Sequence, residues 1–456
     1  MVERKHVSPI ETSVEARKKR RIGFFDVDSG VEANECIKIY LVSSKEEIDS
    51  PDCCCIDPVD LNGFFEEDGM IYGYQGLKIS VWISLVSFSA YANISYESQS
   101  DGGKGITDLK FSLQTIFAET IVESKNDFIN SFSKESHFFS SIISEGELLS
   151  QPQSNGNIGN QKNLLAASTD VQVIRLSLEK PIAGELYCRL IPLVLLLVEG
   201  SNPIEVTDPR WELYALIQGQ KNHRLIGFTA VYRFYHYPDQ TRLRLGQILI
   251  LPPYQHKGFG SHILEVLNNV AISEDVYDLT VEEPLDYFQH VRTRLDVKRL
   301  LEFSPVEDAL NSVVSRLQEA LLSKKEAFPR FTPPASVVEC VRKALKINKK
   351  QFLQCWEILV YLRLDLQEKL LDNFVMVVSS HVKADIVGKG AGAVRKKLVE
   401  VDSDYDCGMS FVVVETSDVE PTAENHANVD EQLKQLIDDR MSAIKLIAQK
   451  LRCAAA

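Results

Sequence analysis

The sequence predicts a mixed α/β protein in which a mostly antiparallel sheet is flanked by helices. One observation is a series of strand patterns between residues 211 and 251, joined by turns. Another is the glycine loop Gln255–Gly260, which separates the last of these strands from a helical pattern. A third is the change to helical spacing from about residue 305. With 456 residues the chain is too long for one core, so we expect several domains.

Composition excludes several classes of protein. A hydrophobic content of 45% and a charged content of 25% are typical of a soluble protein. The net charge of −14 disfavours nucleic acid and favours a basic partner. The nine cysteines form no CxxC pairs, and the longest apolar run, residues 191–198, is too short for a membrane span. We therefore expect a protein of a reducing compartment with no metal, no membrane and no direct contact with nucleic acid.

The N-terminal third is predicted to hold a polar tail and one α/β domain. Residues 1–22 form a disordered basic tail, and its cluster Lys18–Arg21 fits either a nuclear import signal or a solvated charge run. Residues 23–165 form the N-terminal α/β domain, which ends in a flexible loop rich in Ser, Gln, Asn and Gly. Its elements are predicted strands at 36–42 and 77–83, and predicted helices at 112–123 and 127–139.

Residues 166–304 form the predicted core domain, which contains the glycine loop. Its predicted elements are a strand at 171–178, a helix at 186–198, strands at 209–217, 225–237, 241–251 and 276–281, and a helix that starts near Ser261 after the glycine loop. A helical domain is expected at 305–378, a flexible acidic linker at 379–425 and a coiled helix at 426–452. This last helix carries an apolar seam that would dock on a partner or on the chain itself, formed by Leu433, Ile437, Ile444, Ile447 and Leu451.

The glycine loop suits a phosphate group. Unpaired N–H groups at a helix start attract anions, and glycines let the anion approach closely. The spacing fits neither the P-loop nor the GxGxxG dinucleotide motif. It does fill the pattern Gln/Arg-x-x-Gly-x-Gly/Ala, and so resembles the acetyl-CoA loop of the GCN5-related N-acetyltransferase superfamily. That resemblance implies the fold of this superfamily, with acetyl-CoA as co-substrate. The alternative is a surface turn before a helix.

Acetyl transfer to an amine requires a base, because a free lysine with a pKa of about 10.4 is almost fully protonated at pH 7. Glu282 and Glu283 follow the predicted strand at 276–281, and Glu199 ends the helix before the strands of residues 211–251, which form a predicted antiparallel meander. Adjacent carboxylates can raise one another's pKa. The alternative is a solvated strand end. No cysteine lies between Cys188 and Cys340, which favours direct transfer in a ternary complex over a covalent acetyl-enzyme.

Five blocks together resemble the type B histone acetyltransferases over about residues 30–378. The blocks are Tyr72–Ile79, Tyr235–Asp239, Gln247–Gln255, Leu279–Pro284 and Leu345–Gln351. The long acidic tail that ends in a coiled helix resembles the plant form. The resemblance implies acetylation of lysines in the N-terminal tail of newly made histone H4, a WD-repeat histone-binding subunit as partner, and a location in the nucleus and cytoplasm.

The resemblance also implies roles for individual residues. Glu282 would be the general base, supported by Glu199 and by Glu283, where Asp is usual. Main-chain groups of Ile248, Leu249 and Ile250 would bind the pantetheine arm. The pyrophosphate would be held by Gln255, His256, Lys257, Gly258, Phe259, Gly260 and Ser261. The histone channel would be lined by Glu66, Glu67, Asp68, Tyr232, Arg233 and Phe234.

Two other functions remain open from the sequence. The chain could acetylate another protein or a small amine, or it could be a catalytically silent histone chaperone. The intact glycine loop and the full set of carboxylates disfavour the chaperone, and the aromatic strand around Tyr232 disfavours a small amine.

Overall fold

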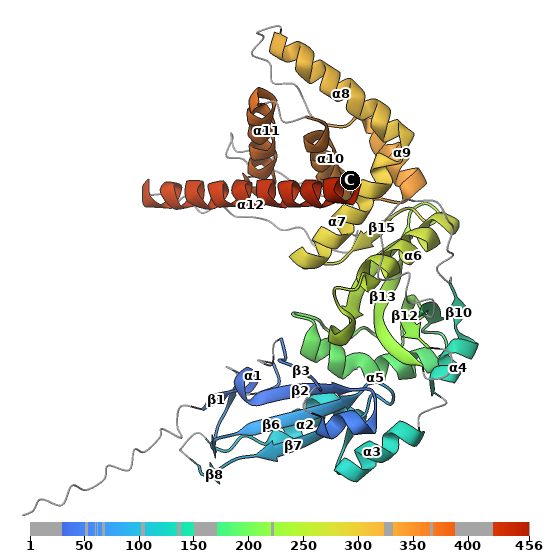
Figure 1. Cartoon of the computed structure of the whole chain (residues 1–456), viewed down its shortest axis with the longest axis vertical. Helices are drawn as coiled ribbons and strands as arrows, with labels where there is room; N and C mark the ends of the chain where they lie inside the picture. The colour runs from blue at the N-terminus through green and yellow to red at the C-terminus, as the bar shows by residue number, and fades with distance from the viewer. Residues whose placement is uncertain are drawn as a thin grey trace, which may run out of the picture. The chain divides into compact units, whose positions relative to one another are not determined.

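The computed structural model describes residues 30–50, 53–59, 61, 63–65, 69–101, 105–134, 138–149, 171–219, 223–322, 332–364, 368–387 and 423–455. Within these residues the chain forms two compact units, each with its own large sheet (Figure 1). The first unit takes its described residues from 30–84, 88–133 and 191–202. The second takes them from 85–87, 134–190 and the chain from 203 onward. The predicted basic tail lies outside the described residues.

The first unit is built on a five-stranded sheet. Its order is β3 (Cys54–Ile56), β2 (Ile37–Val42), β6 (Lys78–Ser84), β7 (Ala90–Ser95) and β9 (Ile121–Val122). The pairs β2–β6 and β7–β9 are parallel, and the other two pairs are antiparallel. The predicted strands at 36–42 and 77–83 are confirmed as β2 and β6. Smaller elements are β1 (Val31–Glu32), α1 (Ala33–Cys36), β4 (Met70–Ile71), β5 (Tyr74–Gln75) and β8 (Ser98–Gln99).

The helices between residues 109 and 145 differ from the predicted ones. Helix α2 (Leu109–Phe117) starts earlier than predicted, because the Asp108 side chain caps it by accepting from the N–H of Phe111 at 3.0 Å. It also ends earlier, since Ala118 adopts a φ of 46° and Ile121 then pairs with Ala90 in the sheet. The predicted helix at 127–139 is two helices, α3 (Lys125–Lys134) and α4 (Phe138–Glu145).

The second unit contains a six-stranded sheet. Its order is β10 (Glu147–Leu148), β11 (Val171–Ser177), β12 (Trp211–Gln218), β13 (Arg224–His236), β14 (Gln240–Ile250) and β15 (Leu279–Val281). Every neighbouring pair is antiparallel except β14–β15, which is parallel. The predicted meander is confirmed, while the strand predicted at 276–281 is regular only over its last three residues.

Helices cover both faces of this sheet. Helix α6 (Phe259–Ser273) packs on one face, where Ile263 and Leu267 are fully buried among residues such as Leu243. Helix α5 (Pro181–Leu197) lies on the other face, where the Tyr187 hydroxyl donates to Gln247 Oε1 at 2.8 Å. Helix α5 starts five residues earlier than predicted, at a proline whose fixed φ suits the first helical position.

In the described part of the chain, six helices follow the glycine-loop helix: α7 (Asp286–Leu301), α8 (Ser304–Leu322), α9 (Ala335–Leu345), α10 (Lys349–Arg363), α11 (Glu368–Val387) and α12 (Ala423–Ala455). All six contribute to one hydrophobic core, in which Leu300, Phe352 and Leu359 are fully buried. The helical region therefore begins at Asp286, before the predicted start at 305. Helix α11 continues to Val387, past the predicted end at 378. The described chain contains no helix of the length and apolarity that crossing a membrane requires.

The predicted coiled helix docks on the chain itself. Helix α12 packs on α7, α10 and α11 (Figure 1). From its predicted seam, Ile444, Ile447 and Leu451 are buried in the shared core, and Ile437 is partly buried against it. The Arg440 side chain pairs with Glu357 of α10 at 2.9 Å.

Candidate active site

A β-bulge interrupts β14 at Gly246. Ala230 of β13 pairs with Gln247 and Val231 pairs with Leu245, so Gly246 is the extra residue. Strand β15 pairs with β14 only up to Leu245, and the last bond runs from the N–H of Glu282 to the Leu245 carbonyl at 3.0 Å. Beyond Gly246, the described residues put no strand against this edge of β14, which is therefore open.

The register decides which main-chain groups face the open edge. The N–H of Leu251 donates to the Ile226 carbonyl at 2.9 Å, and bonded pairs alternate along an antiparallel ladder. The peptide groups of Leu249 therefore face β13, whereas those of Ile248 and Ile250 face the open edge. The Ile250 carbonyl accepts from Gln255 Nε2 at 2.8 Å. Three residues are predicted to bind the pantetheine arm through their main chain. Two of them, Ile248 and Ile250, have peptide groups that face the open edge, whereas Leu249 does not.

Helix α6 presents an anion-binding end. It begins at Phe259, two residues before the predicted start, after Gly258 adopts a left-handed φ of 89°. The first helical bond runs from His262 N–H to the Gly258 carbonyl, so the N–H groups of Phe259, Gly260 and Ser261 precede the helical ladder. A Cβ on Gly260 would meet nothing nearer than 3.9 Å. These residues fit the diphosphate of a coenzyme.

Most side chains of the glycine loop are exposed to solvent. Gln255, His256 and Lys257 are exposed, and Lys257 Nζ donates to the Pro253 carbonyl at 2.8 Å. His256 Nδ1 lies 3.4 Å from the hydroxyl of Tyr287, which is 66% exposed in the first turn of α7. Phe259 is buried, so it can offer an anion only its N–H group.

The Glu282 carboxylate lies beside the bulge. A Cβ on Gly246 would be 3.5 Å from Glu282 Oε2 and 2.8 Å from Trp211 Cη2. Among the described residues, the Glu282 carboxylate has no hydrogen-bond or ion-pair partner. It is exposed, and Glu283 next to it is exposed with a φ of 33°. An unpaired carboxylate at the point where two strands separate can accept a proton from a group bound there.

Aromatic rings extend from Trp211 along the same face of the sheet. The rings of Trp211 and Tyr232 have centroids 4.9 Å apart, and those of Tyr232 and Phe234 have centroids 4.4 Å apart. The Tyr232 hydroxyl donates to Asp208 Oδ2 at 2.9 Å. Hydrogen bonds from Arg210 hold the pKa of Asp208 at about 2, so this carboxylate is ionised at neutral pH. Two of the predicted channel residues, Tyr232 and Phe234, therefore lie on the face that carries Trp211.

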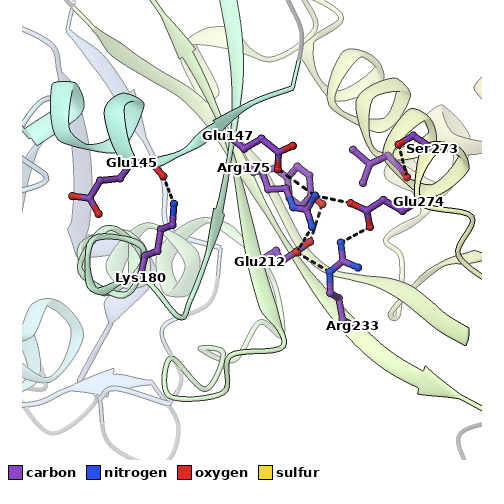
Figure 2. A network of polar contacts seen from close by, with 10 residues as sticks. Glu145, Glu147, Arg175, Lys180, Glu212, Arg233, Ser273 and Glu274 are labelled. Carbon is purple, nitrogen blue, oxygen red and sulfur yellow. Dashed lines mark hydrogen bonds and ion pairs between the residues drawn. The ribbon is translucent and has the colours of Figure 1, made fainter. Parts of the chain in front are cut away.

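Arg233 lies on the opposite face, where it joins a network of ion pairs. It donates to Glu212 Oε1 at 2.7 Å and to Glu274 Oε2 at 2.6 Å. Arg175 binds the same two carboxylates, and Figure 2 shows Glu274 between the two guanidinium groups. Burial alone would raise the pKa of Glu274, but the hydrogen bonds from Arg233 and Arg175 lower it. This network ties the end of α6 to three strands.

Comparison with known proteins identifies the family. Residues 29–199 match the family described as histone acetyl transferase HAT1 N-terminus, and residues 199–289 match the acetyltransferase (GNAT) family. A histone acetyltransferase type B catalytic subunit from Arabidopsis thaliana is 52% identical over 96% of this chain and 95% of that protein. This chain belongs to the type B histone acetyltransferase catalytic subunits.

Other similar proteins include a type B catalytic subunit from Zea mays, 43% identical over 99% of this chain and 97% of that protein. Among solved structures, a ribosomal-protein-alanine N-acetyltransferase from Brucella melitensis biovar Abortus 2308 is 18% identical. The match covers 26% of this chain and 82% of the acetyltransferase, with a TM-score of 0.21.

As a type B histone acetyltransferase catalytic subunit, the chain is an acyltransferase, and the predicted superfamily and fold class are confirmed. The GNAT family uses acetyl-CoA, which agrees with the predicted co-substrate. The roles of individual residues stay predictions.

The roles of four further predicted site residues stay predictions. Glu199 is exposed in the turn after α5 and belongs to the first compact unit, whereas Glu282 belongs to the second. The acidic loop residues Glu66, Glu67 and Asp68 lie outside the described residues.

Sequence reasoning missed Trp211 and Gly246. A glycine inside an apolar strand is a recognised signal for a bulge or a close approach, so Gly246 was open to prediction. The position of Trp211 beside it depends on the pairing of three strands, which no local pattern reveals.

Proposed function

We propose that this type B histone acetyltransferase catalytic subunit transfers acetyl from acetyl-CoA to lysine side chains in the N-terminal tail of newly made histone H4. The family supports a histone substrate, and the net charge of −14 favours a basic peptide. The observation that carries the mechanism is the unpaired Glu282 carboxylate beside the Gly246 bulge, next to the open edge of β14.

In this proposal the N–H groups of Phe259, Gly260 and Ser261 bind the diphosphate of acetyl-CoA. The main-chain groups of Ile248 and Ile250, which face the open edge, hydrogen-bond the pantetheine arm. Acetyl-CoA, when bound, supplies the thioester carbonyl that the lysine amine attacks. These groups are fixed before binding, so little reorganisation is needed when the coenzyme arrives.

Glu282 acts as the general base. At pH 7 only about one lysine in a few thousand is neutral, because its pKa is about 10.4. The Glu282 carboxylate accepts the ammonium proton, directly or through one water molecule, and frees the amine lone pair for attack. Trp211, Tyr232 and Phe234 form the apolar side of the same approach, where they can pack against the lysine stem.

Transfer is direct, without an acetyl-enzyme. The sequence has no cysteine between Cys188 and Cys340, so the strands from β12 to β15 and the glycine loop lack a thiol nucleophile. Rapid quench with labelled acetyl-CoA alone tests this step: no protein-bound label is expected, and a stable acetyl-enzyme would contradict direct transfer.

The substrate is tested by mass spectrometry of an H4 tail peptide after incubation with the protein and acetyl-CoA. We expect acetylated lysines in the peptide. When a small polyamine replaces the peptide, we expect no acetylated polyamine. Acetylation of the polyamine alone would favour a small amine as substrate, and binding of the peptide without acetylation would favour a silent chaperone.

We also propose that the chain works with a WD-repeat histone-binding subunit in the nucleus and cytoplasm, as expected from its resemblance to the family. Affinity purification of the tagged full chain from both cell fractions tests this. Recovery without a WD-repeat protein, or from one fraction only, would contradict the corresponding part.

A further inference from the structure

Strand β15 is held on both edges. On one side it pairs with β14, and on the other it contacts the connection between α9 and α10. The N–H of Leu279 donates to the Lys346 carbonyl at 2.9 Å, and Leu279 forms an isolated parallel bridge with Ile347. Residues 345–348, which are the last residue of α9 and this connection, therefore lie where a seventh strand of the sheet would lie. It comes from a part of the chain that follows the GNAT match by more than 50 residues.

Two arginines bind the outer edge of β15, which is the edge that faces away from β14. Arg342 of α9 donates to the Tyr277 carbonyl at 2.9 Å, and its guanidinium lies 3.8 Å from the centre of the Tyr277 ring. Arg292 of α7 is buried and donates to the Leu279 carbonyl at 3.2 Å. On the inner side, β15 is held by three positions paired with β14 and by the buried ion pair of Arg242 with Asp278, so the two arginines secure the side that β14 does not reach.

Buried charges fix the connection in turn. Asp296 is 4% exposed and accepts from Arg299 at 3.1 Å and from Gln351 at 3.0 Å. Arg299 also donates to the Leu345 carbonyl at 2.7 Å. Lys346 is buried as well and pairs with Asp275 at 2.5 Å. A buried charge is stable only with its partners in place, so these pairs favour a single position of the connection.

We propose that Arg292 and Arg342, together with residues 345–348, position Glu282 for proton transfer. We call this group the outer-edge clamp. Glu282 is the first residue after β15, and its N–H is bonded to β14, so the position of β15 sets where its carboxylate lies relative to Gly246. The two arginines are positioning residues, because they act through the strand. The proposal rests on the proposed role of Glu282 as the base.

The two arginines of the clamp make no described hydrogen bond to the coenzyme site. None of the hydrogen bonds that the structure describes for Arg292 and Arg342 involves β14 or α6, which carry the main-chain groups for acetyl-CoA. Loss of an arginine should therefore lower turnover and leave acetyl-CoA affinity unchanged. A merely structural role would instead lower both together with stability.

The test uses the full chain with Arg292→Met and Arg342→Met. Steady-state kinetics with acetyl-CoA and H4 tail peptide give kcat, calorimetry gives the Kd of acetyl-CoA, and hydrogen exchange follows the amides of Leu279 and Glu282. We expect kcat to fall about 10- to 100-fold, because a displacement of about 1 Å can cost about 100-fold in rate. The Kd should stay at the wild-type value, and both amides should exchange faster.

Matched controls come from the same helices. Lys298 of α7 and Lys343 of α9 are exposed, so Lys298→Met and Lys343→Met should keep wild-type kcat and exchange. Arg292→Lys and Arg342→Lys keep a donor and should recover part of the lost kcat.

Three results would overturn the clamp. They are an unchanged kcat in both arginine variants, exchange at Leu279 and Glu282 that is no faster than in the wild type, and a kcat, acetyl-CoA affinity and Tm that fall together. The variant Glu282→Gln separates this from the proposed function. If Glu282→Gln loses turnover while the arginine variants keep it, the clamp fails alone. If Glu282→Gln keeps turnover, the base assignment fails and the positioning proposal fails with it.

Discussion

The bulge at Gly246 gives the sharpest test of the site geometry. In Gly246→Ala the new Cβ would lie 2.8 Å from Trp211 Cη2 and 3.1 Å from Cζ3. Carbon atoms in contact prefer separations of about 3.5–4.0 Å, so the indole or the bulge must move by roughly 0.7–1.2 Å. The Cβ would also lie 3.5 Å from Glu282 Oε2, where it narrows the space beside the carboxylate.

A shift of this size should be costly at an active site. Since a misplacement of about 1 Å can cost about 100-fold in rate, we expect kcat on H4 peptide to fall roughly 10- to 100-fold. The nearest atoms to the new methyl group belong to Trp211 and Glu282 and none of them to α6, so the Kd of acetyl-CoA measured by calorimetry should be unchanged. Gly184→Ala is the matched control, because a Cβ there meets nothing within 4 Å, and it should keep wild-type kcat. A Gly246→Ala enzyme with normal kcat would show that the space beside Gly246 does not control the reaction.

Three further predictions concern the base, the loop and the ion-pair network. Glu282→Gln should lower kcat about 10²–10⁴-fold with acetyl-CoA binding kept, whereas Glu283→Gln should have a smaller effect; the reverse order would move the base to Glu283. Gly258→Ala should raise the acetyl-CoA Kd by roughly 5- to 30-fold, because a left-handed φ of 89° costs a residue with a Cβ about 1–2 kcal/mol; an unchanged Kd would show that this turn is not needed. Glu274→Gln should lower the Tm most above pH 4.5. Folding lowers the pKa of Glu274 below its ordinary value of 4.5, so its charge stabilises the protein fully above that pH and this stabilisation is lost as the pH falls. A Tm difference from wild type that is constant with pH would contradict this.

The strands around the site were predictable because their local signals are strong. Alternation and turn residues predicted the meander from β12 to β14, and the glycine spacing predicted where α6 begins to within two residues. Period-2 alternation also contains the information that Arg233 faces away from Tyr232 and Phe234. The ion pairs of Arg233 with Glu212 and Glu274 were not predictable, because they depend on a strand and a helix that are distant in sequence.

Other features depended on tertiary contacts. The helix predicted at 112–123 is shorter because Ile121 joins the sheet, which overrides the helical spacing of the segment. The seam of α12 was visible as a pattern, but its partner was not, since a heptad-like repeat fits a second chain as well as α10 and α11. The link between β15 and Lys346 spans more than 60 residues and has no sequence signature.

In the proposed mechanism, the Glu282 carboxylate receives the proton of a lysine whose acetyl donor is bound at α6 and the open edge of β14. A crystal structure with coenzyme A joined covalently to the lysine of an H4 tail peptide tests it most directly. We expect the diphosphate on the N–H groups of Phe259 to Ser261, and the lysine nitrogen within about 3.2 Å of Glu282 or joined to it through one water molecule. A lysine nitrogen beyond that reach, with another carboxylate beside it, would show that Glu282 is not the base.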